Sequence, residues 1–168
     1  MRNYESLVVR RAGGEAGESL VRLIAEFRAE LAQLRGEERS PDLAAAREEL
    51  AEYLGKGFPI YVAELAGEPV GYLVCRVDGD VVWAEQLYVR PEFRRRGIGS
   101  ALYEKAEELV RELGSDTVYN WVHPNNEAII QFLNRRGYRV LNLIELRRPW
   151  PGEQPQRRIR VGDHEFLY

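Results

Sequence analysis

One short segment constrains this chain more than any other: an arginine-rich turn with two glycines that joins a predicted strand to a predicted helix. The turn reads Arg94-Arg95-Arg96-Gly97-Ile98-Gly99-Ser100. A helix N-terminus offers unpaired backbone N–H groups and the positive end of the helix dipole, and glycines let the backbone approach an anion without a Cβ in the way. This order of elements predicts an anion site, suited to a diphosphate, at the turn.

Three other interpretations of the turn compete with this one. It could be a solvated arginine cluster before a helix, or a helix start whose glycines serve packing alone. A dinucleotide-binding fingerprint would need a third glycine at position 102, where Leu102 stands, and antiparallel strands precede the turn. The sequence therefore excludes a Rossmann-type site and leaves the first two interpretations open.

The composition bounds the class of protein. Of 168 residues 45% are hydrophobic, enough for one domain with a proper core, and 30% charged residues with a mean hydropathy of -0.43 indicate a soluble protein. The longest apolar run is only a few residues, too short for a bilayer, and residues 1–5 lack the apolar core of a secretion signal. A net charge of -3 gives no global basic field, so we expect neither a nucleic-acid nor a membrane partner.

Cysteine usage points to a reducing compartment. Cys75 is the single cysteine, so an internal disulfide and a cysteine metal cluster are excluded, and no other metal-ligand cluster is visible. We expect a cytoplasmic protein without a metal. Cys75 falls within a predicted strand with no histidine at a recognisable spacing, which favours a buried core residue over a nucleophile.

The hydrophobic pattern predicts helices in the first third of the chain and strands after it. Ser40 is the expected N-cap and Pro41 the first residue of the second helix. Period-2 patterns bounded by Gly, Pro and Asp predict the strands, three of which form an antiparallel meander. The expected helices are 15–35, 41–54, 99–113 and 126–136, and the expected strands are 7–9, 58–65, 69–77, 81–89, 117–122 and 138–146.

The end of the chain differs in texture from the rest. Pro149, Pro151 and Pro155 mark a linker. We expect one domain over residues 1–148 and a C-terminal extension over residues 149–168. Residues 159–168 could add a last strand, on the same chain or on a partner chain, so a homodimer is one possibility.

Two blocks of sequence together resemble a known family. The block from Leu87-Tyr88-Val89 through the arginine-rich turn to Leu102 resembles the acetyl-CoA motif of the GNAT N-acetyltransferase superfamily, Arg/Gln-x-x-Gly-x-Gly/Ala. The second block resembles the motif that follows it in the family, an Asn, a short amphipathic helix and then Gly-Phe/Tyr. It consists of Val122-His123-Pro124-Asn125-Asn126-Glu127-Ala128, then Phe132 and Arg136-Gly137-Tyr138. The strong match covers about residues 58–147.

The resemblance implies a fold and a cofactor site. The fold would be α/β (α+β), a mixed, mostly antiparallel sheet with splayed fourth and fifth strands, flanked by about four helices. The pantetheine arm of acetyl-CoA would lie in the gap, paired with the backbone of Leu87 and Val89. Backbone amides from Arg95 to Ser100, with the arginines including Arg94, would hold the pyrophosphate. Asn126 would either lie near the pantetheine or cap the next helix.

The implied activity is transfer of an acetyl group from acetyl-CoA to a primary amine by direct attack in a ternary complex. The acceptor could be a protein N-terminus, a lysine or a small-molecule amine. A protonated amine must first lose a proton, commonly to a carboxylate or histidine. Glu85 is the candidate general base, since it shares a face with Leu87 and Val89 if the strand is regular; a bulge would change that. His123 is the second candidate, against a structural role in the His123-Pro124 turn.

Two departures from the family pattern bear on mechanism. Leu133 stands where many members carry the tyrosine that protonates the leaving thiolate, and Trp121 stands where some N-terminal acetyltransferases carry a base. Leu133 supports the alternative of a non-catalytic acyl-CoA sensor or interaction domain, and transfer of a longer acyl group is a third option. Trp83 and Trp121 could line the acceptor pocket or pack in the core.

Overall fold

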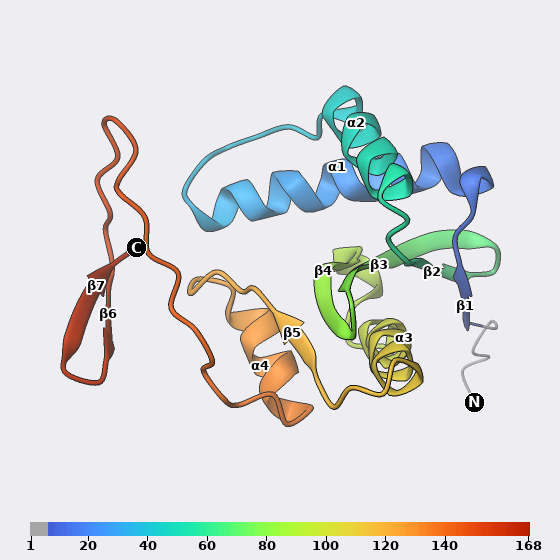
Figure 1. The fold of residues 1–168 in the computed structure, drawn as a ribbon. Coiled ribbons are helices and arrows are strands. Elements are labelled where there is room, and N and C mark those ends of the chain that lie inside the picture. Colours follow the sequence, from blue (N-terminus) through green and yellow to red (C-terminus); the bar gives the residue numbers. More distant parts are fainter. Residues whose placement is uncertain (1–6) are drawn as a thin grey trace. The chain divides into compact units, whose positions relative to one another are not determined.

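The computed structural model describes residues 7–168, within which the elements follow the predicted order as far as α4 (Figure 1). The helices are α1 (Gly17–Leu34), α2 (Leu43–Gly55), α3 (Ile98–Glu112) and α4 (Glu127–Arg135), with short 3-10 turns at Gly14–Ala16 and Pro91–Phe93. The strands are β1 (Leu7–Arg11), β2 (Ile60–Leu65), β3 (Glu68–Asp78), β4 (Val81–Val89), β5 (Val118–Asn120), β6 (Arg158–Val161) and β7 (His164–Leu167). The chain divides into two compact units, one ending at Trp121 and the other spanning Val122–Tyr168.

The first unit is built on a five-stranded sheet. Its strand order is β1-β2-β3-β4-β5, and every neighbouring pair is antiparallel except β4 and β5, which run parallel. Asp78 pairs with Val81, so β3 and β4 are joined by a two-residue hairpin loop in which Gly79 has φ +62°. The predicted mixed, mostly antiparallel sheet is confirmed, and its one parallel pair is β4 with β5.

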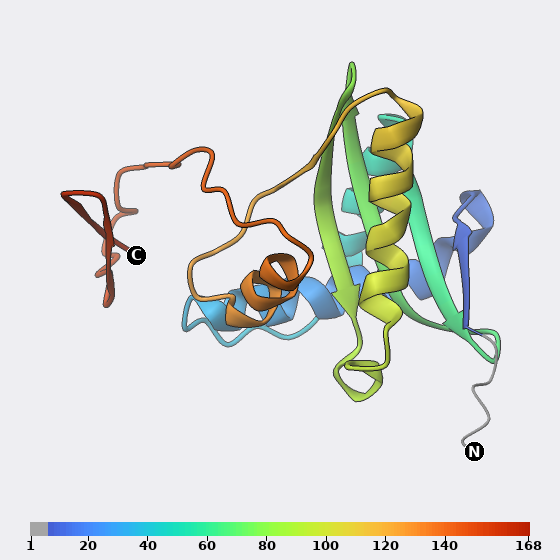
Figure 2. The same ribbon diagram turned by 90° about the horizontal axis from the view of Figure 1, so that it is seen from below.

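Helices cover both faces of this sheet. Figure 2 shows α3 along one face, with α1 and α2 behind the other. The α1/α2 face holds the main apolar cluster, in which Leu23 and Ile24 pack with Tyr72 and Tyr88 of the central strands. On the α3 face, Leu102 and Tyr103 are fully buried. The sheet is thus covered on both sides, as its long apolar strand β3 requires.

The N-cap predicted for the second helix is wrong. Asp42, not Ser40, caps α2: its backbone is extended and its carboxylate accepts a hydrogen bond from the N–H of Ala45 at 3.0 Å. Asp is as good an N-cap as Ser, and this one lies three residues before a free helical amide. The helix therefore starts at Leu43, and Pro41 precedes it.

The second unit departs further from the prediction. Residues 138–146 form no strand, and Val140 is 90% exposed. Strand-type side chains need a paired neighbour to be stabilised, and this segment has no ladder partner in the described chain. The predicted last strand is instead a hairpin, in which β6 and β7 pair with each other around Gly162 (φ +58°) and Asp163. Within residues 7–168, no helix has the length and apolar character needed to cross a membrane.

Candidate active site

The arginine-rich turn leaves a continuous run of backbone donors without partners. Backbone hydrogen bonding stops at Arg94, whose N–H donates to the carbonyl of Pro91 at 3.2 Å, and resumes at Ala101, whose N–H donates to Gly97 at 2.9 Å. Between them, the amides of 95–100 have no backbone acceptor in the described chain. These donors lie at the positive end of the 15-residue helix α3. We call the amides of residues 95–100 the anion cradle, after the ligand that the sequence predicts for them.

The shape of the turn depends on two left-handed residues. Gly97, the N-cap of α3, has φ +81°, and Arg95 has φ +60°. No atom lies within 4 Å of the position that a Cβ on Gly97 would take, so an anion meets open space there. Ile98 is 2% exposed and anchors the turn to the core. The burial of Ile98 therefore anchors the run of amides to the core from within.

Arg94 has a different environment from its neighbours. Its Nε donates to the carbonyl of Val89 at 2.7 Å, its Nη2 lies 2.6 Å from the carboxylate of Glu30, and its guanidinium lies over the Tyr88 ring. These contacts tie the turn to the end of β4 and to α1. Arg95 and Arg96 are exposed, so they are the arginines that can contribute positive charge to the cradle.

The strands β4 and β5 separate after a short paired stretch and so form a fork. The two strands pair only at three positions, from Val82 with Val118 to Ala84 with Asn120. From residue 85 to Val89, β4 continues beside β3, with no β5 residue opposite its other edge. A backbone edge of this kind offers N–H and C=O groups to an extended ligand. The 3-10 turn Pro91–Phe93 connects this edge to the anion cradle.

A β-bulge falls on Glu85. Val74 pairs with Gln86 and Cys75 with Ala84, so Glu85 is an extra residue in β4. The expectation that Glu85 shares a face with Leu87 and Val89 is therefore not met. Its carboxylate instead lies 3.7 Å from Nε of Arg76. Arg76 is two residues after Val74 in β3, so its side chain lies on the same face of the sheet as Val74 and the α1/α2 cluster.

Next to the bulge, a buried polar network joins β4 to α2. Gln86 is 3% exposed, and its Oε1 accepts from the hydroxyl of Tyr72 at 2.8 Å. Its Nε2 donates to Glu49 at 2.7 Å and to the hydroxyl of Tyr53 at 2.9 Å. Tyr53 donates to Glu49 at 2.6 Å, and Arg28 of α1 donates to both oxygens of the same carboxylate. Every group of Gln86 is thus satisfied inside the protein.

This network shifts the ionisation of its members. Burial favours the neutral form of Glu49, but hydrogen bonds from Arg28, Tyr53 and Gln86 outweigh it and hold the pKa of Glu49 below its usual range. Burial and the bond to Glu49 raise the pKa of Tyr53. Elsewhere, burial raises the pKa of the Cys75 thiol to about 12, which fits the predicted core role.

Aromatic side chains gather at the base of the fork. The Trp83 ring lies 5.1 Å from that of Tyr119 and 4.7 Å from that of Trp121, measured between centroids. The guanidinium of Arg76 lies over both indoles. Trp121 is 59% exposed, so this cluster faces solvent in part and is not core packing alone.

The remaining predicted residues lie in the second unit. His123 accepts a hydrogen bond at Nδ1 from the N–H of Asn125 at 3.1 Å, which supports its structural role in the turn. Asn126 is the N-cap of α4, and its Oδ1 accepts from the N–H of Ile129 at 3.3 Å. Leu133 is buried, at 6% exposure. These contacts occupy both polar side chains locally.

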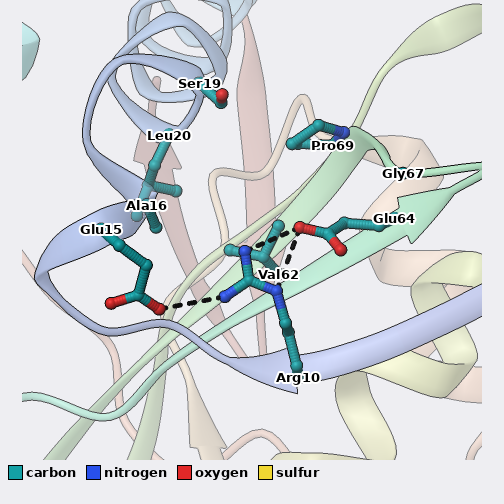
Figure 3. A pocket seen from close by; sticks show the side chains of 9 residues that line it. All are labelled: Arg10, Glu15, Ala16, Ser19, Leu20, Val62, Glu64, Gly67 and Pro69. Carbon is teal, nitrogen blue, oxygen red and sulfur yellow. Dashed lines mark hydrogen bonds and ion pairs between the residues drawn. The ribbon is translucent and has the colours of Figure 1, made fainter.

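A separate pocket of about 170 Å³ lies beside the start of α1, lined by residues of β1, β2 and the β2–β3 loop (Figure 3). Arg10 crosses it and pairs with Glu64 at 2.8 Å and Glu15 at 3.3 Å. Its charged groups are therefore already paired with one another. Across residues 7–168, no group of three or more His, Cys, Asp or Glu side chains has the arrangement of a metal site.

The sequence interpretation missed Arg76, Gln86, Glu49 and their partners. A signal for Arg76 was available, because a two-residue hairpin at Gly79-Asp80 places Arg76 directly opposite Trp83. No comparable signal exists for Glu49, which reaches Gln86 only through the packing of α2 on the sheet.

Comparison with known proteins decides which family carries this arrangement. The acetyltransferase (GNAT) family pattern matches residues 23–138, which include the fork and the anion cradle. This chain belongs to the GNAT acetyltransferase family. Over 92 residues it is 33% identical to an uncharacterized N-acetyltransferase of Methanocaldococcus jannaschii, covering 51% of this chain and 41% of that protein. An acetyltransferase of Pectobacterium atrosepticum is 34% identical over 85 residues, covering 51% and 60%. The chain thus spans about half the length of these curated relatives.

Solved structures share the GNAT fold with this chain. The PaiA N-acetyltransferase of Thermoplasma acidophilum, in complex with coenzyme A, has a TM-score of 0.67 and 18% identity, covering 78% of this chain and 88% of that one. The aminoglycoside N-acetyltransferase AAC(6')-Iy, in complex with CoA, has a TM-score of 0.66 and 18% identity, covering 85% and 94%. At these identities the likeness confirms the fold alone.

Proposed function

We propose that this GNAT protein is an N-acetyltransferase that moves an acetyl group from acetyl-CoA to a primary amine by direct attack in a ternary complex. The observation that carries the proposal is the edge of β4 from residue 85 to Val89, which no strand of the described chain pairs with, followed after one 3-10 turn by the cradle of six amides at 95–100. A pantetheine arm on the edge and a pyrophosphate in the cradle would satisfy both sets of backbone groups. Both relatives named above are described as acetyltransferases.

Within this proposal the cradle binds the donor through its backbone. Hydrogen bonds to a charged group contribute roughly 1.5–3 kcal/mol each, so a few amides suffice to hold a diphosphate. Arg95 and Arg96 add charge from the exposed side of the turn. Arg94 acts differently from the sequence expectation in this proposal: it holds the carbonyl of Val89 and Glu30, so it shapes the site. Leu87 and Val89 supply the backbone for the pantetheine.

Glu85 is the proposed general base. The acceptor nitrogen attacks the thioester carbonyl, a C–N bond forms, the C–S bond breaks, and the proton of the amine passes to the Glu85 carboxylate, directly or through water. An N–H of the free β4 edge would stabilise the oxyanion. A thiol with a pKa of about 8.5 leaves as thiolate without an obligatory acid at mildly alkaline pH, so Leu133 in the tyrosine position does not forbid turnover.

Release of coenzyme A thiol, measured with acetyl-CoA and a panel of amines, tests the proposal. The panel contains an aminoglycoside, a polyamine, lysine, and peptides with free N-termini. Turnover with any of them supports an acetyltransferase. Tight binding of acetyl-CoA with no turnover on the whole panel would instead support the non-catalytic sensor.

A further inference from the structure

Arg76 occupies an unusual environment at the base of the fork. Its Cζ lies 4.9 Å from the ring centre of Trp83 and 4.6 Å from that of Trp121, and the two ring centres are 4.7 Å apart. Two indoles therefore hold one guanidinium by cation–π contacts, which fix its orientation without using any of its N–H groups. All three residues belong to the first unit.

The N–H groups of Arg76 make no hydrogen bond among the described residues. Its Nε is buried and lies 3.7 Å from Oε2 of Glu85, also buried, and neither atom has a hydrogen-bond partner among the described residues. Within residues 7–168, the terminal nitrogens of Arg76 have no hydrogen-bonded partner either, and 30% of the side chain is exposed. A guanidinium held this way matches a carboxylate, which it can bind through two parallel N–H groups.

The charges around the site argue against a polycationic acceptor. Glu49 is paired with Arg28, Glu26 with Arg90, and Glu30 with Arg94. Glu85, the proposed base, lies next to Arg76 of β3. The charges of Glu49, Arg28 and Glu85 all influence the pKa of Tyr53 on α2. The carboxylates of Glu49, Glu26 and Glu30 are already paired with arginines, so they offer little attraction to a polycation. The Arg76 guanidinium would also repel a polycation, because both are positively charged.

We propose that the acceptor is a small amine that also carries a carboxylate, such as an amino acid. Arg76 and Glu85 form a cation–anion pair, and the complement of that pair is a molecule with the opposite charges at a similar spacing. The acceptor carboxylate binds the terminal nitrogens of Arg76 beside the two indoles, and its amine is delivered to Glu85. The products are the N-acetylated amino acid and coenzyme A, and the amine proton is taken by Glu85. This inference rests on the proposed acetyl transfer.

Matched acceptors test this recognition. Straight-chain amino acids that carry the amine and the carboxylate at opposite ends, in a series of increasing chain length, are compared by kcat/KM with the carboxamides of the same length. One lost charged hydrogen-bonding interaction corresponds to about a 10- to 100-fold change, so we expect the best carboxylate to exceed its carboxamide by about that factor. Arg76→Met keeps a long apolar side chain against the indoles and should bring the ratio close to one. Arg39→Met, at a 70% exposed side chain in the α1–α2 loop, is the control and should keep the ratio.

A binding measurement separates this inference from the proposed function. Trp83 and Trp121 are the tryptophans that remain in a Trp150→Phe background, and carboxylate bound at Arg76 should change their fluorescence. One outcome is that the amine with a carboxylate quenches the fluorescence, that Arg76→Met abolishes this quenching, and that no amine is acetylated. That outcome would overturn the acetyltransferase proposal and support the carboxylate site. Turnover with equal kcat/KM for carboxylates and carboxamides, or a preference for an aminoglycoside, would overturn the carboxylate site alone.

Discussion

Gly71 lies in β3 directly opposite Val89, the last residue of the strand that leads into the anion cradle. A Cβ built on Gly71 would lie 2.7 Å from the carbonyl oxygen of Tyr88, 3.1 Å from Cγ2 of Val89 and 3.3 Å from Cδ1 of Leu102. The first of these is a backbone atom in the middle of the sheet, so it cannot rotate away. Gly71→Ala therefore forces β3 and β4 apart or displaces α3.

The expected cost follows from these contacts. Overpacking a closed site typically costs about 1–3 kcal/mol, and replacing a strand glycine by alanine returns roughly 0.5–1 kcal/mol of backbone entropy. We expect Gly71→Ala to lower the free energy of unfolding by about 1–2 kcal/mol, which corresponds to a fall in Tm of roughly 2–8 °C for a chain of this size. Urea unfolding and a thermal melt measure both. Because Val89 moves with the clash, KM for acetyl-CoA should also rise.

Gly55 provides the matched control, because it allows the same substitution without the clash. It ends α2, its φ is not positive, and no atom lies within 4 Å of the Cβ position. Gly55→Ala should leave stability unchanged or raise it by up to about 1 kcal/mol. If Gly71→Ala unfolds at the same urea concentration as Gly55→Ala, the sheet accommodates the extra methyl group and the reasoning about a closed site is refuted.

Three further changes test the site. Gly99→Glu places bulk and negative charge in the cradle and should abolish the thermal shift given by acetyl-CoA; an undiminished shift would exclude pyrophosphate binding there. Glu85→Gln should lower kcat by about 10²-fold or more and remove the acidic limb of its pH profile, and an unaltered profile would exclude Glu85 as base. The lowered pKa of Glu49 means that its ionised form stabilises the fold above its ordinary pKa and that this stabilisation is lost as pH falls through the folded value. Glu49→Gln should therefore show a smaller loss of Tm below about pH 5 than the unaltered protein, and equal losses would contradict the role of that carboxylate.

Sequence predicted best those features that depend on neighbouring residues. The cradle is formed by a few consecutive residues at the start of α3, so its glycines and the helix start follow from local pattern alone. The hairpin at Gly79-Asp80 is equally local, and its register places Arg76 opposite Trp83. The Asn126 cap is read from one side chain and the amide three residues later.

The features that sequence missed depend on distant partners. Residues 138–146 have strand composition, but a strand forms only where a second edge pairs with it, and composition does not name that edge. The bulge at Glu85 leaves no mark in the sequence of β4, because nearly all residues before Glu85 and after Gln86 in that strand are apolar. Glu49 lies 37 positions before Gln86, and only the packing of α2 brings them together.

The bulge and the buried network explain each other. A bulge turns two consecutive side chains, here Glu85 and Gln86, toward the same face of the sheet. Such an irregularity costs ladder hydrogen bonds and persists only where other contacts determine it. Gln86 supplies them, since shifting β4 by one residue would leave its amide and the Tyr72 hydroxyl buried without partners. The α1/α2 layer thereby sets the register of β4. In consequence Glu85, the extra residue, is held beside Arg76 at the point where the pairing of β4 with β5 ends.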